Sequence, residues 1–102
     1  MSIDLNEKNF AATVAETEGL SIVQMTAPWC GPCRMLAPRL QELEDEGLFT
    51  YFKVNVDENP ELAREFRIMS IPTLIAYRNG ESRKVIVGAK TKTQLLDELK
   101  DV

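Results

Sequence analysis

With 102 residues, of which 44% are hydrophobic, the chain is long enough to bury one core, and we expect a single domain over residues 1–102. Its 16 acidic and 12 basic residues are interspersed and leave a net charge of −4, which excludes the basic stripe that a nucleic-acid partner requires. The N-terminus lacks the features of a signal peptide and no apolar run is long enough to span a bilayer, so we expect a cytoplasmic protein without membrane contact.

The N-terminal quarter of the chain predicts a helix and then a buried strand. Asn6 is suited to cap a helix that continues through Phe10 and Val14, and Gly19 is suited to end it. The nearly continuous apolar run LSIVQMT at residues 20–26 is typical of a strand that is covered on both faces. An additional edge strand is expected if the first few residues pair with the sheet.

A second helix is predicted from about residue 31 to residue 46, where Gly47 ends it. Its expected buried positions recur at helical spacing: Met35, Leu36, Leu40 and Leu43. Pro38 lies inside this helix, removes one backbone hydrogen bond and is expected to bend the axis. The sequence TYFKVNV at residues 50–56 predicts the next strand.

The remaining elements are a short helix, a hairpin and a final helix. Asn59 followed by Pro60 predicts the start of a helix that contains Leu62, Ala63 and Phe66. Asn79–Gly80 between the strands TLIAYR and KVIVG is a strong hairpin signal. Thr91 and Gln94 have capping-box spacing at the start of the last helix, whose expected buried residues are Leu95, Leu96 and Leu99. This alternation predicts an α/β sandwich with a mostly parallel sheet and a terminal antiparallel hairpin.

Both cysteines of the chain lie at the predicted junction of the first buried strand and the second helix. Cys30 is expected near the helix cap and Cys33 about one turn later, a spacing that suits a disulfide. The positive end of the helix favours an anion at Cys30, which predicts a nucleophilic thiolate there. Cys33, shielded by Met35, Leu36 and the preceding strand, is expected to be the resolving thiol.

Three other interpretations of the cysteine pair fit the sequence less well. A complete zinc site needs four ligands, but the chain has two cysteines and no histidine. A structural disulfide across so short a loop would restrict the unfolded chain very little. An inert buried pair does not fit the surrounding Trp29, Gly31 and Pro32, which form a turn-and-cap sequence. A redox-active dithiol is therefore the favoured interpretation, with no bound cofactor and no metal.

The motifs together resemble the thioredoxin family. They are WCGPC at residues 29–33, KVNVDENP at residues 53–60, IPT at residues 71–73 and VGA at residues 87–89. The resemblance covers essentially the whole chain and implies the thioredoxin fold, a three-layer α/β/α sandwich with a central mixed sheet of four to five strands and about four helices. It also implies a reductase of protein disulfides that cycles between the Cys30–Cys33 dithiol and disulfide.

The same resemblance implies where client proteins bind. Pro72 is expected to follow a cis peptide bond and to face the dithiol, beside backbone that pairs with an extended client segment. The implied client-binding residues are Trp29, Gly31, Pro32, Ile71, Pro72, Thr73, Val87, Gly88 and Ala89. The implied partners are disulfide-containing proteins and an NADPH-linked thioredoxin reductase as electron donor, because the chain has no glycine-rich loop with which to bind NADPH itself. Nothing in the sequence requires more than a monomer.

Two positions depart from the family pattern. Gln24 stands where thioredoxins usually carry a buried aspartate that takes the proton of the resolving thiol, and an amide cannot act as that base. Thr26 replaces a frequent tryptophan. Lys53 matches the lysine that lies near the missing carboxylate, so we expect it either to extend to solvent or to lose its proton more readily. We hypothesise that Lys53, or a water held by Gln24, transfers the proton of Cys33.

Two alternative functions stay open at this point. The chain is consistent with a non-catalytic adaptor that uses the apolar surface around Cys30 to hold a partner. It is also consistent with an oxidase or isomerase of folding proteins, which would require an oxidising compartment.

Overall fold

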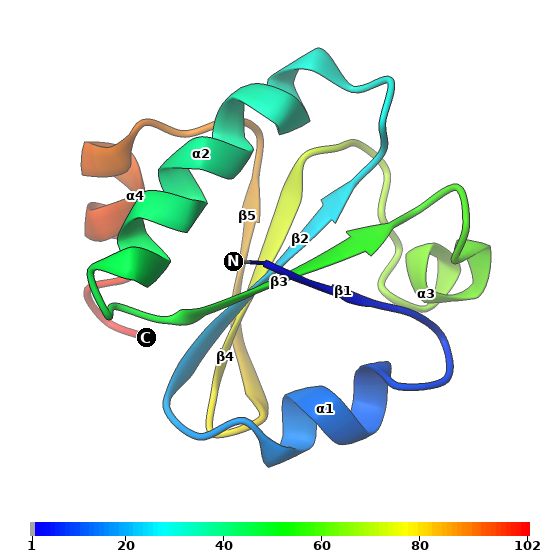
Figure 1. Ribbon diagram of the computed structural model, residues 1–102, viewed down its shortest axis with the longest axis horizontal. Helices are drawn as coiled ribbons and strands as arrows, with labels where there is room; N and C mark the ends of the chain where they lie inside the picture. The colour runs from blue at the N-terminus through cyan, green and yellow to red at the C-terminus, as the bar shows by residue number, and fades with distance from the viewer. Residues whose placement is uncertain (1) are drawn as a thin grey trace.

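Strands and helices alternate along residues 2–102, the part of the chain that the computed structural model describes (Figure 1). Their bounds are β1 (Ile3–Leu5), α1 (Phe10–Glu16), β2 (Leu20–Thr26), α2 (Gly31–Asp45), β3 (Thr50–Asn55), α3 (Pro60–Glu65), β4 (Thr73–Arg78), β5 (Glu81–Val87) and α4 (Lys92–Glu98). The predicted element types and their order are confirmed, including an edge strand at the N-terminus. The predicted strand at residues 50–56 ends one residue earlier, at Asn55.

The five strands form one mixed sheet in the order β1-β3-β2-β4-β5. The pairs β1–β3 and β3–β2 are parallel, whereas β4 is antiparallel to both β2 and β5. The hairpin between β4 and β5 turns at Asn79 and Gly80, whose φ angles of 53° and 81° are the positive values that a tight hairpin turn requires. The predicted mixed sheet and its C-terminal hairpin are therefore confirmed.

Helices cover both faces of the sheet, which gives a three-layer sandwich (Figure 1). Phe10 and Val14 of α1 and Leu62 of α3 belong to the core on one face. On the other face, residues of α2 and α4 pack against alternate residues of the same strands: Leu36, Leu40, Leu43 and Leu95. Because both faces are covered, β2 is buried from Ser21 to Met25, as its sequence predicted.

The predicted bounds of the first helix are wrong at both ends. Asn6 does not cap it; its Oδ1 accepts hydrogen bonds from the backbone N–H of Lys8 and Asn9, at 2.9 and 3.0 Å, in a turn before the helix. The cap position is Asn9, and the helix ends at Glu16, before the left-handed Gly19. The bonds to Asn6 from the N–H groups two and three residues later are those of a capping asparagine, but they close the turn at residues 7–9 that precedes α1.

Two residues predicted to be buried are exposed. Met35 is 62% exposed and Leu96 is 41% exposed, whereas their neighbours Leu36 and Leu95 are fully buried. Each helix residue turns the side-chain direction by about 100°, so only one of two adjacent apolar residues faces the sheet squarely. The prediction that Met35 shields Cys33 is therefore wrong.

Of the caps predicted for α3 and α4, only the one at α4 makes its side-chain hydrogen bonds. Thr91 and Gln94 make both hydrogen bonds of the capping box at α4. Asn59 occupies the cap position of α3, but its side chain makes no capping hydrogen bond. Its Oδ1 instead accepts from the N–H of Glu7 at 3.1 Å and its Nδ2 donates to the carbonyl of Asn55 at 3.0 Å, which ties α3 to the β1–α1 loop.

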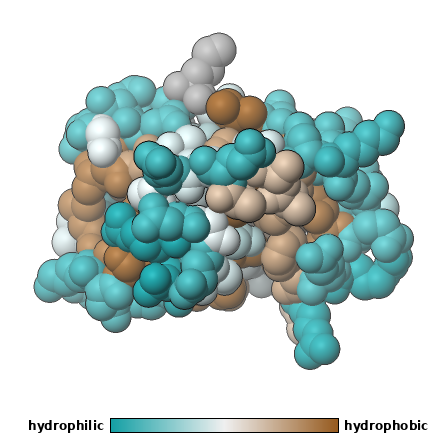
Figure 2. Space-filling view, turned by 90° about the horizontal axis from the view of Figure 1, so that it is seen from below, coloured by the Kyte–Doolittle hydropathy of each residue, from teal (hydrophilic) through white to brown (hydrophobic). Residues whose placement is uncertain are grey.

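The carboxyl end of β2, the start of α2 and the loop before β4 lie together at the top of Figure 1, and α1 lies at the bottom. Seen from below, hydrophilic side chains surround smaller hydrophobic areas (Figure 2). Within residues 2–102, no helix combines the length and apolar character needed to cross a membrane.

Candidate active site

The first turn of α2 presents Cys30 to the end of the sheet. Cys30 is the cap residue, and its Sγ accepts a hydrogen bond from the backbone N–H of Cys33 at 3.2 Å. Gly31 and Pro32 occupy the first helical positions, where proline has no hydrogen bond to lose. The Cys33 N–H is therefore directed at the Cys30 sulfur, which lies at the positive end of the helix dipole.

Cys30 and Cys33 form a disulfide, with their Cα atoms 5.3 Å apart. Cys30 is 4% exposed and Cys33 is 1% exposed, so Cys30 is the outer sulfur of a pair that is largely covered in this oxidised form. Ala27 completes the buried cluster around them, and Val56 and Ile71 pack against it. The dithiol site is therefore assembled from the β2–α2 turn, the end of β3 and the loop before β4.

The loop before β4 lies against the outer sulfur. The Ile71–Pro72 peptide bond is cis, and Cys30 Sγ lies 3.9 Å from the carbonyl oxygen of Ile71. Pro72 is followed directly by β4, and its carbonyl accepts a hydrogen bond from Gly88 N–H at 2.9 Å. The segments that carry the IPT and VGA motifs are thus joined beside the disulfide.

The nine residues predicted to bind clients divide by exposure. Trp29 and Val87 are 67% and 56% exposed, and Pro32 and Ala89 are exposed as well. Gly31, Ile71 and Gly88 are half-buried, whereas the side chains of Pro72 and Thr73 are buried. Thr73 Oγ1 donates to the Ser70 carbonyl at 2.7 Å and so faces its own loop. Pro72 and Thr73 therefore support this surface from below and add little to its exposed area.

Sequence reasoning missed two features beside Trp29. The indole Nε1 donates a hydrogen bond to Asp57 Oδ2 at 2.7 Å, which fixes one orientation of the exposed ring. A hollow of about 330 Å³ next to the indole is lined by Trp29, Val56, Pro60, Ala63, Ile68, Met69, Ser70 and Ile71. Met69 is 95% exposed, so an apolar side chain stands at this surface without cover. The exposure of these residues depends on the meeting of α3, β3 and the loop before β4, which no local pattern reveals.

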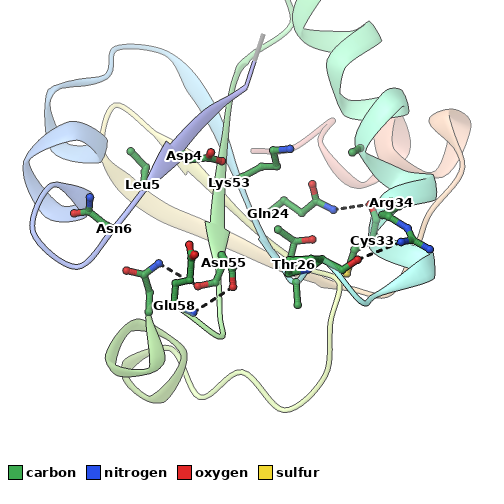
Figure 3. Close-up of a pocket in the computed structure, with 14 residues that line it drawn as sticks. Asp4, Leu5, Asn6, Gln24, Thr26, Cys33, Arg34, Lys53, Asn55 and Glu58 are labelled. Carbon is green, nitrogen blue, oxygen red and sulfur yellow. Dashed lines mark hydrogen bonds between the residues drawn. The ribbon is translucent and has the colours of Figure 1, made fainter.

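A second, more polar cavity of about 360 Å³ is lined by the inner cysteine, Cys33 (Figure 3). Cys33, Gln24 and Lys53 all line it, as do the charged residues Asp4, Arg34 and Glu58. Gln24 is fully buried and Lys53 is half-buried, on neighbouring positions of β2 and β3. Lys53 thus lies beside Gln24 in the sheet and lines the same cavity as Cys33.

Gln24 contacts the peptide backbone of the inner cysteine. Its Nε2 donates to the carbonyl oxygen of Cys33 at 3.1 Å, and its Oε1 accepts a hydrogen bond from the hydroxyl of Tyr51. Sequence reasoning did not find Tyr51, whose only sequence signal is its position two residues before Lys53 on the same strand. Both polar atoms of the amide are thus engaged in the core.

Within residues 2–102, no group of three or more potential ligand side chains is arranged to hold a metal ion. The chemistry available at this site is the making and breaking of the sulfur–sulfur bond between Cys30 and Cys33. A close pair of cysteines at a helix start, on an α/β sandwich, defines a thiol–disulfide oxidoreductase.

Comparison with known proteins agrees with this class. The family model described as thioredoxin matches residues 1–101. The thioredoxin of Mycobacterium tuberculosis is 46% identical over 99% of this chain and 89% of its own length. The chain therefore belongs to the thioredoxin family.

Two longer relatives contain the same unit within a larger protein. The bifunctional thioredoxin reductase/thioredoxin of Mycobacterium leprae is 44% identical over 100% of this chain, which spans 23% of that protein. The chloroplastic M-type thioredoxin of Spinacia oleracea is 40% identical over 94% of this chain, which corresponds to 54% of the spinach protein.

Proposed function

We propose that the chain reduces disulfides in other proteins, with Cys30 as the attacking thiolate and Cys33 as the resolving thiol. The observation that carries this assignment is the position of Cys30 at the cap of α2, where its sulfur accepts the Cys33 N–H. An N–H bond and a helix N-terminus both stabilise the thiolate over the thiol. Cys33 is the inner, less exposed residue of the two.

In the proposed cycle the Cys30 thiolate attacks one sulfur of a client disulfide. A Cys30–client disulfide forms and the other client sulfur leaves as a thiolate. The Cys33 thiolate then attacks Cys30, which closes the Cys30–Cys33 disulfide and releases the second client sulfur. The client gains two electrons and the protein loses two, so an external reductant must reopen the disulfide before the next cycle.

The proposed client surface surrounds the outer sulfur. Its exposed members are Trp29, Pro32, Val87 and Ala89, and its half-buried members are Gly31, Ile71 and Gly88. These residues carry no side-chain charge, which suits extended apolar segments of many sequences. We propose that the backbone beside Pro72 pairs with such a segment, since peptide pairing gives affinity without demanding particular side chains.

We propose that an NADPH-linked thioredoxin reductase supplies the electrons. The fused Mycobacterium leprae relative, whose name includes both activities, supports this type of partner. We propose that Lys53, or a water bound at Gln24, accepts the proton of Cys33, because Lys53 and Gln24 line the same polar cavity as that cysteine. Gln24 itself has no titratable proton.

We further propose that residues 1–102 act as one monomeric domain in the cytoplasm. The family match over residues 1–101 supports the single domain. Size-exclusion chromatography tests the monomer, and cell fractionation tests the location, which is of interest because the spinach relative is named as chloroplastic.

Reduction of insulin by dithiothreitol, with and without the protein, tests the proposed activity. We expect catalysis by the wild type, none by Cys30→Ser, and a trapped client disulfide with Cys33→Ser. An adaptor would leave insulin reduction at the uncatalysed rate, and its partner binding would survive Cys30→Ser. An oxidase or isomerase would show a potential above about −200 mV.

A further inference from the structure

Tyr51 and Gln24 form a hydrogen-bonded pair beneath the disulfide. Gln24 is fully buried and Tyr51 is 1% exposed, and the Tyr51 hydroxyl bonds to Gln24 Oε1. In the parallel register of β2 and β3, Ile22 pairs with Tyr51 and Gln24 pairs with Lys53. Tyr51 is therefore the diagonal neighbour of Gln24 on the same face of the sheet, at a separation that an aromatic side chain can span.

The Cys33 carbonyl and the Tyr51 hydroxyl, which flank the Gln24 amide, determine the direction of its hydrogen bonds. The Cys33 carbonyl can only accept, so the amide must present its Nε2 to it, and the distance is 3.1 Å. Oε1 then faces Tyr51, whose hydroxyl must donate its proton. If the amide were rotated, Oε1 would meet the carbonyl oxygen and two acceptors would repel. Tyr51 and Cys33 together thus permit one orientation of Gln24.

The Tyr51 hydroxyl keeps its proton under ordinary conditions. Burial raises the pKa of this phenol above its usual value of 10.0, and the negative charges of Asp4 and Glu44 raise it further. A neutral phenol and a neutral amide make the same hydrogen bonds at every physiological pH. The pair therefore supplies geometry to the site and no proton.

We propose that Tyr51 is a positioning residue for the resolving step: through Gln24 it holds the main chain of Cys33, and hence the Cys33 sulfur, in line with the Cys30–client disulfide. This inference rests on the proposed roles of the two cysteines. A buried acid next to the resolving thiol is replaced here by a neutral brace that runs from Tyr51 to Gln24 and then to Cys33. Without the phenol, Oε1 would be a buried acceptor lacking a donor, and the amide would be free to turn away from Cys33.

The experiment separates the two sulfur-exchange steps with dithiobis(nitrobenzoate). The Cys30 thiolate attacks this aromatic disulfide, so that a Cys30–thionitrobenzoate disulfide forms and one thionitrobenzoate leaves. The Cys33 thiolate then attacks Cys30, and the Cys30–Cys33 disulfide forms as the second thionitrobenzoate leaves. Stopped-flow absorbance records two phases, the first set by Cys30 and the second by Cys33.

For Tyr51→Phe we expect the second phase to slow about fivefold, which corresponds to the loss of one buried hydrogen bond of about 1 kcal/mol. The first phase should stay within about twofold of wild type, because the hydrogen bonds of the pair end at the Cys33 carbonyl and neither of them involves Cys30. Gln24→Leu should slow the second phase similarly. In the double variant the Tyr51 change should add nothing further, since it acts only through Gln24.

Tyr77→Phe is the matched control, because Tyr77 is the other tyrosine of the chain and is buried in the core on the opposite face of the sheet. It should leave both phases unchanged. The inference is overturned if folded Tyr51→Phe resolves at the wild-type rate, if both phases slow equally, or if the effects of Tyr51 and Gln24 add. A missing second phase in the wild type would instead refute the proposed role of Cys33.

A measurement on the wild type covers the case in which Tyr51→Phe fails to fold. In nitrogen-15 spectra of the oxidised and the reduced protein, we expect the Gln24 side-chain amide to exchange its protons with solvent much more slowly than the exposed Gln94. Exchange at the rate of an exposed glutamine in the reduced protein would overturn the brace.

Discussion

The indole of Trp29 is fixed to Asp57: Nε1 donates to Oδ2 at 2.7 Å, although the ring is 67% exposed. We predict that Asp57→Ala frees the ring and slows insulin reduction about twofold, because part of the proposed client surface becomes disordered. Trp29 is the only tryptophan, so its fluorescence anisotropy reports the change directly. Asp57→Asn keeps an acceptor oxygen and should retain most of the wild-type anisotropy. Equal anisotropy in the wild type and in Asp57→Ala would contradict the prediction.

Substitution of Lys53 tests whether this residue takes the proton from Cys33. We predict that Lys53→Met slows the second thionitrobenzoate phase about tenfold, since the proposed acceptor of the Cys33 proton is lost. The neighbouring charged groups in the cavity are Asp4, Arg34 and Glu58, and all three are retained in this variant. Lys8→Met, at an exposed turn, is the control. An unchanged second-phase rate in Lys53→Met would remove Lys53 from the mechanism and leave the proposed water at Gln24.

Gly80 sits at a close approach between the β4–β5 turn and α1. With φ at +81°, a Cβ there would lie 2.9 Å from the backbone Cα and oxygen of Ala15. Gly19 has a similar φ of +75°, but a Cβ there would meet nothing within 4 Å. We predict that Gly19→Ala lowers the free energy of unfolding by roughly 1–2 kcal/mol, the cost of the left-handed backbone alone. Gly80→Ala should cost about 1–3 kcal/mol more because of the clash.

Urea unfolding of the two glycine variants measures this difference. Equal losses of stability would show that the hairpin and α1 separate easily enough to accommodate a methyl group.

Ser21 is fully buried in β2, and its Oγ has no hydrogen-bond partner among residues 2–102. We predict that Ser21→Ala raises the free energy of unfolding by about 1 kcal/mol, since an unpaired hydroxyl is costly to bury. The Tm should rise by roughly 4–8 °C, as measured by calorimetry. Thr73→Val is the contrasting control, because Thr73 donates to Ser70 and its loss should lower the Tm. A lower Tm for Ser21→Ala would mean that the hydroxyl is bonded in solution.

The buried hydroxyl of Tyr77 should make the stability of the protein depend on pH in the alkaline range. Burial raises the pKa of its hydroxyl from 10.0 to about 12, and Glu65 adds to the effect. The pKa of Tyr77 is higher in the folded protein than in the unfolded chain, so the neutral phenol favours the folded state. This contribution to the free energy of unfolding is complete below about pH 10 and is lost as the pH rises towards about 12. The expected loss of unfolding free energy is about 2–3 kcal/mol. Tyr77→Phe should remove this part of the pH dependence, as measured by urea unfolding at several pH values.

The pKa of Tyr51 is also raised by burial, so some alkaline dependence should remain in Tyr77→Phe. An identical pH dependence in the variant and in the wild type would contradict the Tyr77 prediction.

Local patterns were reliable where the structure depends on neighbours in the sequence. The capping box at Thr91 and the hairpin turn at Asn79–Gly80 formed as predicted, because their hydrogen bonds and φ angles involve only a few consecutive residues. Asn6 and Asn59 were harder to interpret. An asparagine side chain can satisfy several backbone groups, and the spatial neighbours decide which ones it bonds.

By itself, the sequence determined the kind of protein this is. The alternation of apolar strands with amphipathic helices specifies the α/β sandwich, and two cysteines one helical turn apart at a helix start specify the dithiol. Both follow from short-range geometry, since residues three apart on a helix necessarily meet.

Only the tertiary structure decided what surrounds that dithiol. Hydrogen bonds join segments that are distant in the chain, from Trp29 to Asp57 and from Tyr51 through Gln24 to Cys33. The exposure of Met35 likewise depends on how α2 packs on the sheet. Such contacts depend on how β2 and β3 are aligned and on which helix face meets the sheet. A shift of one residue in the strand register would send the side chains of that strand to the opposite face, so these relationships exist only once the whole fold has formed.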